Sequence, residues 1–268
     1  MARAAPDPAL AGRVGQYCSY WEETSSFAAR RELAATSGVL IFALGEPLEI
    51  VGADGRAILL KAGQGFAGGM ADSTSISRGM GRQDGVHVFM PTESLAAAVG
   101  APLSALANQV VLLGDLIGRE AEDLGDALGN AGGNERRFAL LDAFLARRFA
   151  RAPGKDEVAC WAARRMLGGA PPSATALARE IGWSRKLLAR RVRGATGFGP
   201  DRLRRLARFE RFAAAIAARP AESLAGLAAE HGYVDQAHLT REVRAFCGMT
   251  PGELRARQIP AAGGVRDD

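Results

Sequence analysis

The segment ALAREIGW at residues 176–183 recurs 50 residues later as GLAAEHGY at residues 226–233. The matches continue at a spacing of 51, where Arg193, Gly197 and Pro200 are followed by Arg244, Gly248 and Pro251. A repeat of this length indicates two copies of one supersecondary unit. Each copy reads as a helix, a tight turn that contains glycine, and a second helix. The repeat therefore predicts two helix-turn-helix units in the C-terminal third of the chain.

Each copy has turn, cap and packing residues in the places that such a unit needs. In the first copy, Gly182 supplies the turn and Ser184 caps the second helix. Leu188 and Val192 lie one helical turn apart on that helix, so we expect them to pack against the first helix. The corresponding residues of the second copy are Gly232, Asp235, Leu239 and Val243.

A helix that begins at proline follows each unit. After the second unit, Thr250, Pro251 and Glu253 form a capping box. After the first unit, the apolar spacing predicts one continuous helix over residues 200–219, ended by Pro220. Such a helix is about 29 Å long. That length is close to the roughly 34 Å between successive major grooves on one side of a DNA duplex.

Charge is distributed unevenly along the 268 residues. Residues 155–257 contain 19 Lys and Arg against 10 Asp and Glu, a net charge of +9, whereas residues 1–154 have a net charge of −3. The chain has three lysines, so arginine dominates its basic residues throughout, but this bias does not explain the asymmetry. A basic domain joined to a mildly acidic one is typical of proteins that bind nucleic acid.

Residues from about 158 to 257 resemble the DNA-binding domain of the AraC/XylS family. In the first unit the resemblance is carried by Leu177, Ala178, Gly182, Ser184, Leu188, Arg190, Gly197 and Pro200. In the second unit it is carried by Gly232, Tyr233, Asp235, Gln236, Ala237, His238, Leu239, Arg241, Gly248, Thr250 and Pro251. Val192 and Val243 depart from the Phe that the family usually has, which implies a smaller core contact. The resemblance implies a sequence-specific transcription regulator.

The residues opposite the packing positions of each second helix are expected to face the major groove. Arginine can donate two hydrogen bonds to guanine, glutamine can pair with adenine, and the methyl groups of Ala and Thr suit thymine. A phosphate contact or a solvated surface position remains the alternative for each arginine. The candidate DNA-binding residues are Ser184, Arg185, Lys186, Ala189, Arg190, Asp235, Gln236, Ala237, His238, Thr240 and Arg241.

The N-terminal half is expected to be an α+β domain, with a short-stranded sheet or barrel followed by helices. Gly, Asp and Ser breaks delimit strands at residues 14–21, 38–44, 57–61, 73–77 and 86–90. After Pro91 the apolar period changes, and helices are expected at residues 92–99, 103–111, 120–128 and 134–150. This half resembles the N-terminal domain of a subgroup of the same regulators in Tyr20, Trp21, Glu22, Leu40, Ile41, Phe42, residues 45–48, Gly100, Pro102, Leu103, Leu113 and Leu116.

An Ala-Pro-Gly break at residues 152–154 marks the expected domain boundary. We expect disordered tails at residues 1–12 and 259–268, the N-terminal domain at 13–152, and an all-helical DNA-binding domain at 153–258. The longest strongly apolar run has about six residues, far short of the roughly 20 that cross a bilayer. No apolar stretch follows Arg3, so no signal peptide is expected. The expected location is the cytoplasm, at the nucleoid and not at a membrane.

The N-terminal domain is expected to sense a small molecule or to mediate dimerisation. The candidate effector-binding residues are Trp21, Phe66, Met70 and Met80, with burial in the core as the alternative for the last three. Residues 63–68 match G-x-G-x-x-G, but no helical pattern follows, so turn and bulge positions are favoured over a dinucleotide site. No cofactor or metal is expected. The expected partners are promoter DNA, a small-molecule effector, RNA polymerase and a second copy of the chain.

An enzyme with a catalytic N-terminal domain, localised by the DNA-binding domain, is the alternative function. Alkyl-transfer DNA repair proteins carry a related module, but their chemistry needs reactive or zinc-bound cysteines. Of Cys18, Cys160 and Cys247, the first alone lies in the N-terminal 150 residues. Three scattered cysteines fit a reducing cytoplasm rather than a disulfide framework. No catalytic set is traceable in the sequence, so a regulator without enzymatic activity is favoured.

The affinity of the protein for a selected DNA site is expected to fall steeply as salt concentration rises. The basic C-terminal domain releases condensed counterions when it binds, and added salt opposes that release. Fluorescence anisotropy at two salt concentrations measures the effect. An affinity that does not change with salt concentration would show that the net charge of this domain does not contribute to DNA binding.

Overall fold

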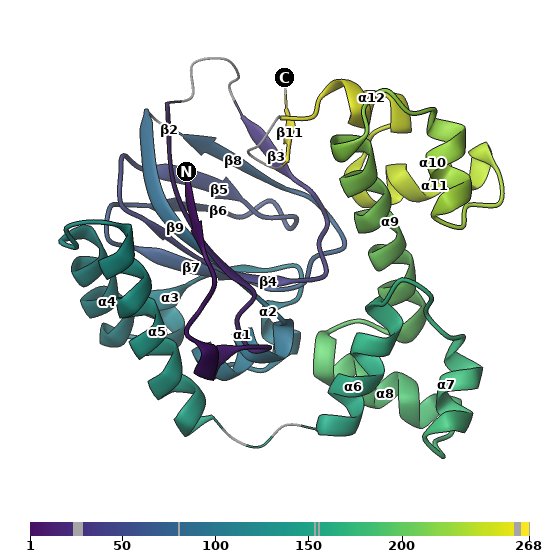
Figure 1. The fold of residues 1–268 in the computed structure, drawn as a ribbon, viewed down its shortest axis with the longest axis horizontal. Coiled ribbons are helices and arrows are strands. Elements are labelled where there is room, and N and C mark those ends of the chain that lie inside the picture. Colours follow the sequence, from purple (N-terminus) through teal and green to yellow (C-terminus); the bar gives the residue numbers. More distant parts are fainter. Residues whose placement is uncertain (24–28, 80, 153, 155, 260–263, 268) are drawn as a thin grey trace.

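The chain folds into two lobes, which Figure 1 shows side by side. The computed structural model describes residues 1–23, 29–79, 81–152, 154, 156–259 and 264–267. The first lobe contains two β-sheets and helices α1 to α5, and the second consists of helices α6 to α12. The expected combination of an α+β N-terminal domain and an all-α C-terminal domain is confirmed.

Two antiparallel sheets face each other in the N-terminal domain. The first sheet has, in spatial order, β1 (Ala2–Ala4), β2 (Gln16–Glu23), β9 (Arg82–Met90), β4 (Gly38–Ala43), β7 (Gly65–Gly68) and β10 (Val110–Leu112). The second has β11 (Val265–Arg266), β3 (Arg30–Glu32), β8 (Ser75–Gly79), β5 (Leu48–Val51) and β6 (Ala57–Leu60). The sequence pattern misses β1, β3, β5, β7, β10 and β11. Each has at most four residues, too few to show an apolar alternation.

Side chains alternate across the central strands β4 and β9, as the pleat of a strand requires. Leu40 and Val88 pack toward the helices of the domain, whereas Ile41 and His87 face the second sheet. The helices are α1 (Thr92–Val99), α2 (Leu103–Leu106), α3 (Leu113–Ile117), α4 (Arg119–Gly129) and α5 (Asn134–Arg151). The first sheet therefore lies between these helices and the second sheet, with a side-chain layer on each face.

Both ends of the chain pair with the sheets, which corrects the expectation of disordered tails at residues 1–12 and 259–268. β1 extends the first sheet, and Leu10 of a short 3-10 helix (Pro8–Leu10) is 3% exposed. β11 extends the second sheet, and Val265 is fully buried; residues 260–263 and 268 lie outside the described residues. An edge strand takes its hydrogen bonds from a distant neighbour, so its own sequence carries little signal.

The expected helix at residues 103–111 is wrong beyond its first turn. α2 ends at Leu106, and Asn108 has a positive φ of 59°, which interrupts the helix. The β-branched residues Val110 and Val111 then enter β10, which pairs with β7. β7 itself is the second half of the glycine-rich segment at residues 63–68, and no helix follows it. A strand thus replaces the phosphate-binding turn that a dinucleotide site would need.

The two helix-turn-helix units occupy the places that the repeat predicts. The first consists of α7 (Ala174–Glu180) and α8 (Arg185–Thr196), and the second of α10 (Leu224–Glu230) and α11 (Gln236–Cys247). Gly182 and Gly232 have left-handed φ values of 72° and 76°, which turn the chain between the helices of each unit. Helix α6 (Glu157–Leu167) precedes the first unit, and α12 (Pro251–Ala256) follows the second.

The expected helix caps are present at both units. Ser184 Oγ accepts a hydrogen bond at 3.1 Å from the N–H group three residues later, and Asp235 Oδ1 accepts the equivalent bond at 2.6 Å. Thr250 and Glu253 form the reciprocal hydrogen bonds of a capping box at the start of α12. These caps satisfy N–H groups that the helices themselves leave unpaired.

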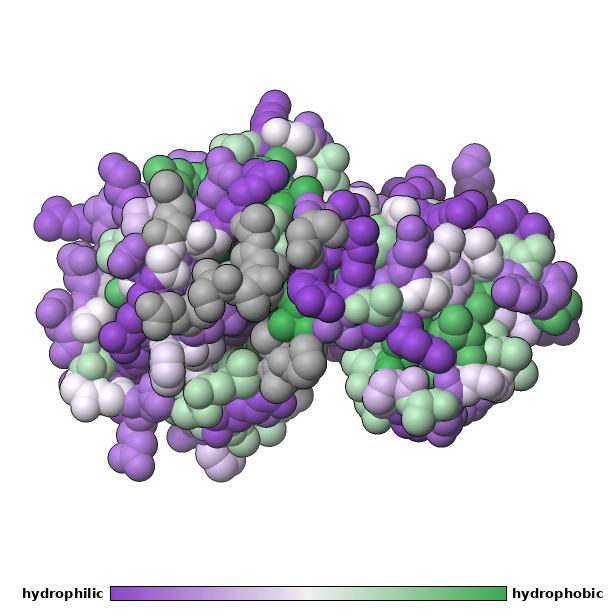
Figure 2. Space-filling view, turned by 90° about the horizontal axis from the view of Figure 1, so that it is seen from above, coloured by the Kyte–Doolittle hydropathy of each residue, from purple (hydrophilic) through white to green (hydrophobic). Residues whose placement is uncertain are grey.

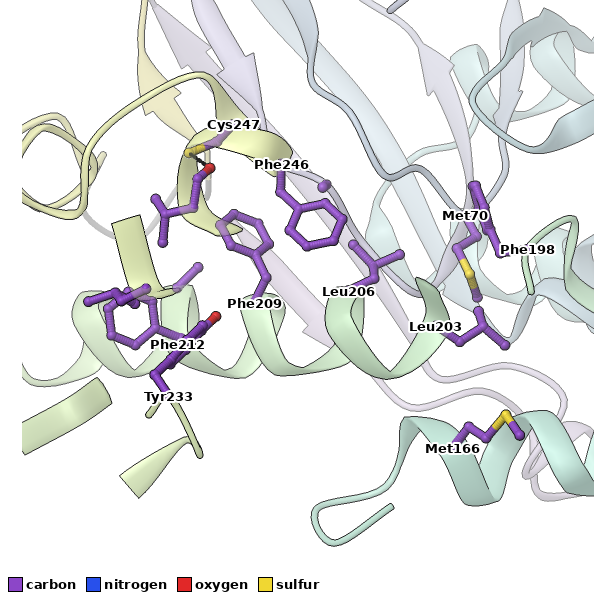
Figure 3. Packing of buried hydrophobic residues seen from close by; sticks show 14 of the residues in the cluster. Met70, Met166, Phe198, Leu203, Leu206, Phe209, Phe212, Tyr233, Phe246 and Cys247 are labelled. Carbon is purple, nitrogen blue, oxygen red and sulfur yellow. Dashed lines mark hydrogen bonds between the residues drawn. The ribbon is translucent and has the colours of Figure 1, made fainter. Parts of the chain in front are cut away.

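Helix α9 (Pro200–Ala218) joins the two units and supplies their common core. The ring of Phe209 lies 5.2 Å from the ring of Phe246 in α11. Toward the other end of α9, Leu203 shares its buried cluster with Leu188 of α8 and with Met70 of the N-terminal domain, and Figure 3 shows Met70 beside Leu203. Both units and the N-terminal domain therefore pack on one helix.

Candidate nucleic-acid interface and ligand cavity

Helix α8 exposes most of the side chains that the sequence assigns to DNA contact. Arg185, Lys186 and Arg190 are exposed and Ala189 is half-buried, whereas Leu188 is buried in the core. Arg190 also borders a groove between α8 and helices α1 and α2 of the N-terminal domain. The first turn of α8 is therefore open to a partner, and its later turns lie next to the N-terminal domain.

Helix α11 presents one continuous exposed face. A shallow depression on it is lined by Gln236, Ala237, Thr240, Arg241 and Arg244. The first four of these are among the candidate DNA-binding residues. Arg244 is an addition that its four-residue spacing from Thr240 would have indicated, because residues at that spacing share a helix face. Its counterpart in the repeat, Arg193, is also exposed.

The other three candidates have partners within the protein. Ser184 and Asp235 cap their helices, as described above. The ring of His238 lies edge-on to the ring of Tyr233 at 5.3 Å, and His238 Nε2 is 3.3 Å from Arg208 Nη2. His238 is half-buried, so the structure places it toward α9 rather than on the exposed face of α11.

A buried charge cluster holds α11 against α9. Glu242 is 2% exposed and accepts hydrogen bonds from Arg205 Nε at 3.0 Å and from Arg208 Nε at 2.8 Å and Nη2 at 2.7 Å. Burial by itself raises the pKa of Glu242, but the hydrogen bonds and charges of the two arginines outweigh it and lower that pKa. The cluster escapes prediction from sequence, because nothing local pairs α9 with α11. It fixes the direction in which the exposed face of α11 points.

Arginines of α9 also line the groove between the two units. They are Arg204, Arg205, Arg208 and Arg211. Arg211 Nη1 donates hydrogen bonds to the carbonyl oxygens at the end of α6, which ties that helix to α9. Figure 2 shows hydrophilic side chains over much of the face seen from above and a notch between the two lobes. Positive charge is thus present between the two units as well as on them.

A cavity of ≈ 310 Å³ lies between the two sheets of the N-terminal domain. Its lining comes from β2, β3, β4, β5, β7, β8 and β9 and from the connections around residues 33–37, 71–74 and 108–110. Its apolar side chains include Val39, Ile41, Leu48, Ile50, Phe66 and Phe89. A concave, mostly apolar surface with polar groups in its wall is the usual form of a small-molecule site.

The four candidate effector residues lie in different places. Phe66 lines the cavity. Met70 is buried in the cluster that joins the two domains. Trp21 is 62% exposed, because its neighbours on either side in β2 line the cavity and alternate side chains point in opposite directions. Met80 lies outside the described residues.

Ionisable side chains form part of the cavity lining. Arg30 Nη2 donates hydrogen bonds to both carboxylate oxygens of Glu22 at 2.7 Å. Glu32 accepts a hydrogen bond from Ser77 Oγ at 3.1 Å. Burial raises the pKa of Glu32, and the charge of Arg30 and the Ser77 hydrogen bond offset this only in part. Burial and the charge of Arg30 lower the pKa of His87 to about 4, so His87 is neutral near pH 7.

One layer of backbone separates the cavity from α9. Ala35 and Ala71 form an antiparallel β-bridge and both line the cavity. The next residue along each segment points the other way, toward α9. In the first segment this residue is Thr36, whose Oγ1 donates a hydrogen bond to Glu210 Oε2 of α9.

Asp72 is the corresponding residue of the second segment. It is 2% exposed and forms an ion pair with Arg202 Nε of α9. Asp72 Oδ1 also accepts a hydrogen bond at 2.9 Å from Asn108 Nδ2, and Asn108 lines the cavity. Asp72 therefore links Asn108 in the cavity lining directly to Arg202 of α9.

Three general features complete the description of the site. Among the described residues, no cluster of three or more His, Cys, Asp or Glu side chains is placed to hold a metal ion. No helix in the described ranges is long and apolar enough to cross a membrane. All three cysteines are buried.

Comparison with known proteins identifies the C-terminal domain and the fold. Residues 177–257 match the family model of a helix-turn-helix domain. The chain is similar to solved structures of ToxT from Vibrio cholerae. In one crystal form the identity is 9%, with 90% of this chain and 98% of ToxT covered and a TM-score of 0.52. For ToxT bound to an unsaturated fatty acid, the identity is 10%, the coverage 89% and 94%, and the TM-score 0.50.

At this level of identity the likeness to ToxT shows a shared two-domain fold. None of the curated proteins matches this chain in sequence. The helix-turn-helix match falls on the segment that the internal repeat marks, and it confirms the resemblance of that segment to AraC-type domains.

Glu32→Gln is expected to raise the melting temperature of the protein near neutral pH. The folded state raises the pKa of Glu32, so it binds a proton more tightly than the unfolded state does, and stability is lost as pH rises through the raised pKa. The uncharged amide keeps the acceptor for Ser77 and removes this loss. The advantage of the variant should disappear below about pH 4, where the carboxyl is protonated in both states.

Thermal melts of both proteins across this pH range measure the effect. Glu49→Gln is the matched control, because Glu49 lies outside the cavity lining and pairs with Arg78 in a solvent-exposed contact. A Glu32→Gln protein that melts below the wild type at neutral pH would contradict the expectation.

Proposed function

We propose, from the AraC-type helix-turn-helix domain that this chain carries at residues 177–257, that the protein is a transcription regulator. Its two units bind adjacent major grooves of promoter DNA, and its N-terminal domain responds to a small molecule. The observation that carries the proposal is the position of two capped helix-turn-helix units at opposite ends of α9 (Figure 1). Each unit exposes basic side chains on its second helix, the element that enters the major groove in this motif.

The spacing of the units supports binding by one chain to one face of DNA. α9 has 19 residues, so it is about 29 Å long. Successive major grooves on one side of a duplex lie roughly 34 Å apart. Arg205 and Arg208 in the groove beside α9 are held by Glu242, whereas Arg204 has, among the described residues, only a long 3.9 Å contact with Asp201. Arg204 therefore suits the phosphate backbone between those grooves, because a guanidinium group can bind phosphate oxygens in pairs.

The cavity supports a sensing role for the N-terminal domain. A ligand there would contact residues 35 and 71 and Asn108, whose neighbours Thr36 and Asp72 hold α9. ToxT, which shares the fold, has been crystallised with an unsaturated fatty acid, so a small molecule is compatible with this architecture. A ligand shifts DNA binding by its difference in affinity for two arrangements of α9, typically by 1–3 kcal/mol, or about 5- to 150-fold.

No observation on the described residues favours the alternative of a catalytic N-terminal domain. Transfer of an alkyl group needs a reactive thiolate. Cys18 is buried in β2, and Cys160 and Cys247 belong to helices of the C-terminal domain. We therefore propose regulation without catalysis.

Arg185→Ala and Gln236→Ala are each expected to change base preference in a different half of the DNA site. A well-formed base contact contributes ~1–3 kcal/mol of discrimination between bases. Selection of bound sequences from a random library, followed by anisotropy on single-base variants, measures the change. Arg119→Ala is the control, because Arg119 is an exposed arginine of the N-terminal domain. If each substitution lowers the affinity for every DNA sequence equally, both side chains contact phosphates and not bases.

Asp72→Asn and Arg202→Gln are each expected to change the affinity of the full-length protein for its DNA site by about fivefold or more. Each substitution breaks the same contact between the cavity wall and α9, so the double variant should behave like either single one. Asp123→Asn with Arg119→Gln removes a solvent-exposed pair on α4 and is the matched control. If Arg202→Gln alone weakens binding, Arg202 contacts DNA directly and the wall does not transmit the signal.

A further inference from the structure

The charges that line the cavity favour a cationic ligand over an anionic one. Among the described lining residues, the charged groups are the carboxylates of Glu22 and Glu32 and the guanidinium of Arg30, because His87 is neutral near pH 7. Arg30 donates hydrogen bonds to both oxygens of Glu22 at 2.7 Å, so the positive charge of Arg30 compensates the negative charge of Glu22. Glu32 is the additional negative charge.

Glu32 has a neutral donor as its hydrogen-bond partner. Ser77 Oγ donates to it at 3.1 Å, and a hydroxyl group does not neutralise a carboxylate. Glu32 is half-buried, and the nearby guanidinium of Arg30 is hydrogen-bonded to Glu22. A carboxylate that has given up part of its hydration without a hydrogen-bonded cation is costly. An ammonium group in contact with Glu32 would offset that cost through a charge-assisted hydrogen bond. A bound cation would also oppose the effect of burial, which raises the pKa of Glu32.

A row of aromatic rings lies along the same part of the cavity. The ring centroids of Tyr20 and His87 are 4.6 Å apart, those of His87 and Phe89 are 5.7 Å apart, and all three residues line the cavity. Glu32 lines the same cavity as these rings. Burial raises the pKa of Tyr20, and the charges of Glu22 and Glu32 raise it further. The faces of Tyr and Phe rings attract cations, most strongly where water is excluded.

We propose that the cavity binds a small organic cation, whose primary ammonium group pairs with Glu32 and whose compact apolar or aromatic body packs against Ile41, Phe66 and Phe89. The proposal rests on the sensing role proposed above and names the ligand class of that same cavity. An organic carboxylate is disfavoured, because it would meet the Glu32 carboxylate and a guanidinium already bonded to Glu22.

Calorimetric titration of the full-length protein with three probes of one carbon skeleton tests the ligand class. The probes are 3-phenylpropan-1-amine, 3-phenylpropan-1-ol and 3-phenylpropanoate, which are similar in size and differ in charge. The amine is expected to bind about tenfold more tightly than the alcohol, or better, and the carboxylate is expected not to bind. Equal binding of amine and alcohol, tighter binding of the carboxylate, or binding of none of the three at millimolar concentration would overturn the proposal.

Two variants locate the binding in the cavity. Glu32→Gln is expected to weaken binding of the amine about tenfold and to leave binding of the alcohol unchanged, which also shows that the cavity is intact. Glu49→Gln makes the same change on an exposed carboxylate outside the cavity lining and is expected to leave amine binding unchanged. Unchanged amine binding in Glu32→Gln, or an equal loss in both variants, contradicts a role for Glu32.

DNA binding by the same samples separates this inference from the function on which it rests. Fluorescence anisotropy on a selected DNA site reports the regulator function without any ligand. A protein that binds DNA but prefers the carboxylate probe refutes the ligand class alone. A protein that binds no DNA refutes the regulator, whatever the calorimetry shows.

Discussion

The apolar packing around α9 is the constraint on which the other features of the molecule depend. Phe209 contacts α11, and Leu203 shares a core with α8 and with Met70 of the N-terminal domain. A single stiff helix thus replaces a linker between the two units, so their exposed faces keep a fixed separation. Close-packed side chains transmit small displacements instead of absorbing them. The N-terminal domain and both units thus contact the same helix.

Buried carboxylates with arginine partners give this packing its orientation. Glu242 receives hydrogen bonds from Arg205 and Arg208 and sets the rotation of α11 on α9. Asp72 pairs with Arg202 and sets the position of α9 on the cavity wall. A buried charge left without its partner is costly, so these ion pairs add a directional constraint to the apolar packing. Glu32 differs from both, since its hydrogen-bond partner is the neutral hydroxyl of Ser77.

The sequence by itself determined the parts of the protein that local interactions build. Ser184, Asp235 and the Thr250–Glu253 pair bond to atoms within three residues of themselves, so their caps and the helix boundaries could be read directly. The exposed faces of α8 and α11 followed from helical periodicity in the same way. Arg244 was within reach of that reasoning, because it continues the face of Thr240 by one turn.

Only the tertiary structure decided the features that join distant segments. The edge strands at both chain ends, the cavity between the sheets and the contact between Thr36 and Glu210, 174 residues apart, have no local signature. Trp21 shows the consequence: its residue type suggests a binding site, but the pairing of β2 turns it to solvent and its neighbours inward. A shift of one residue in strand register exchanges the two faces, and that register is set by partners elsewhere in the chain.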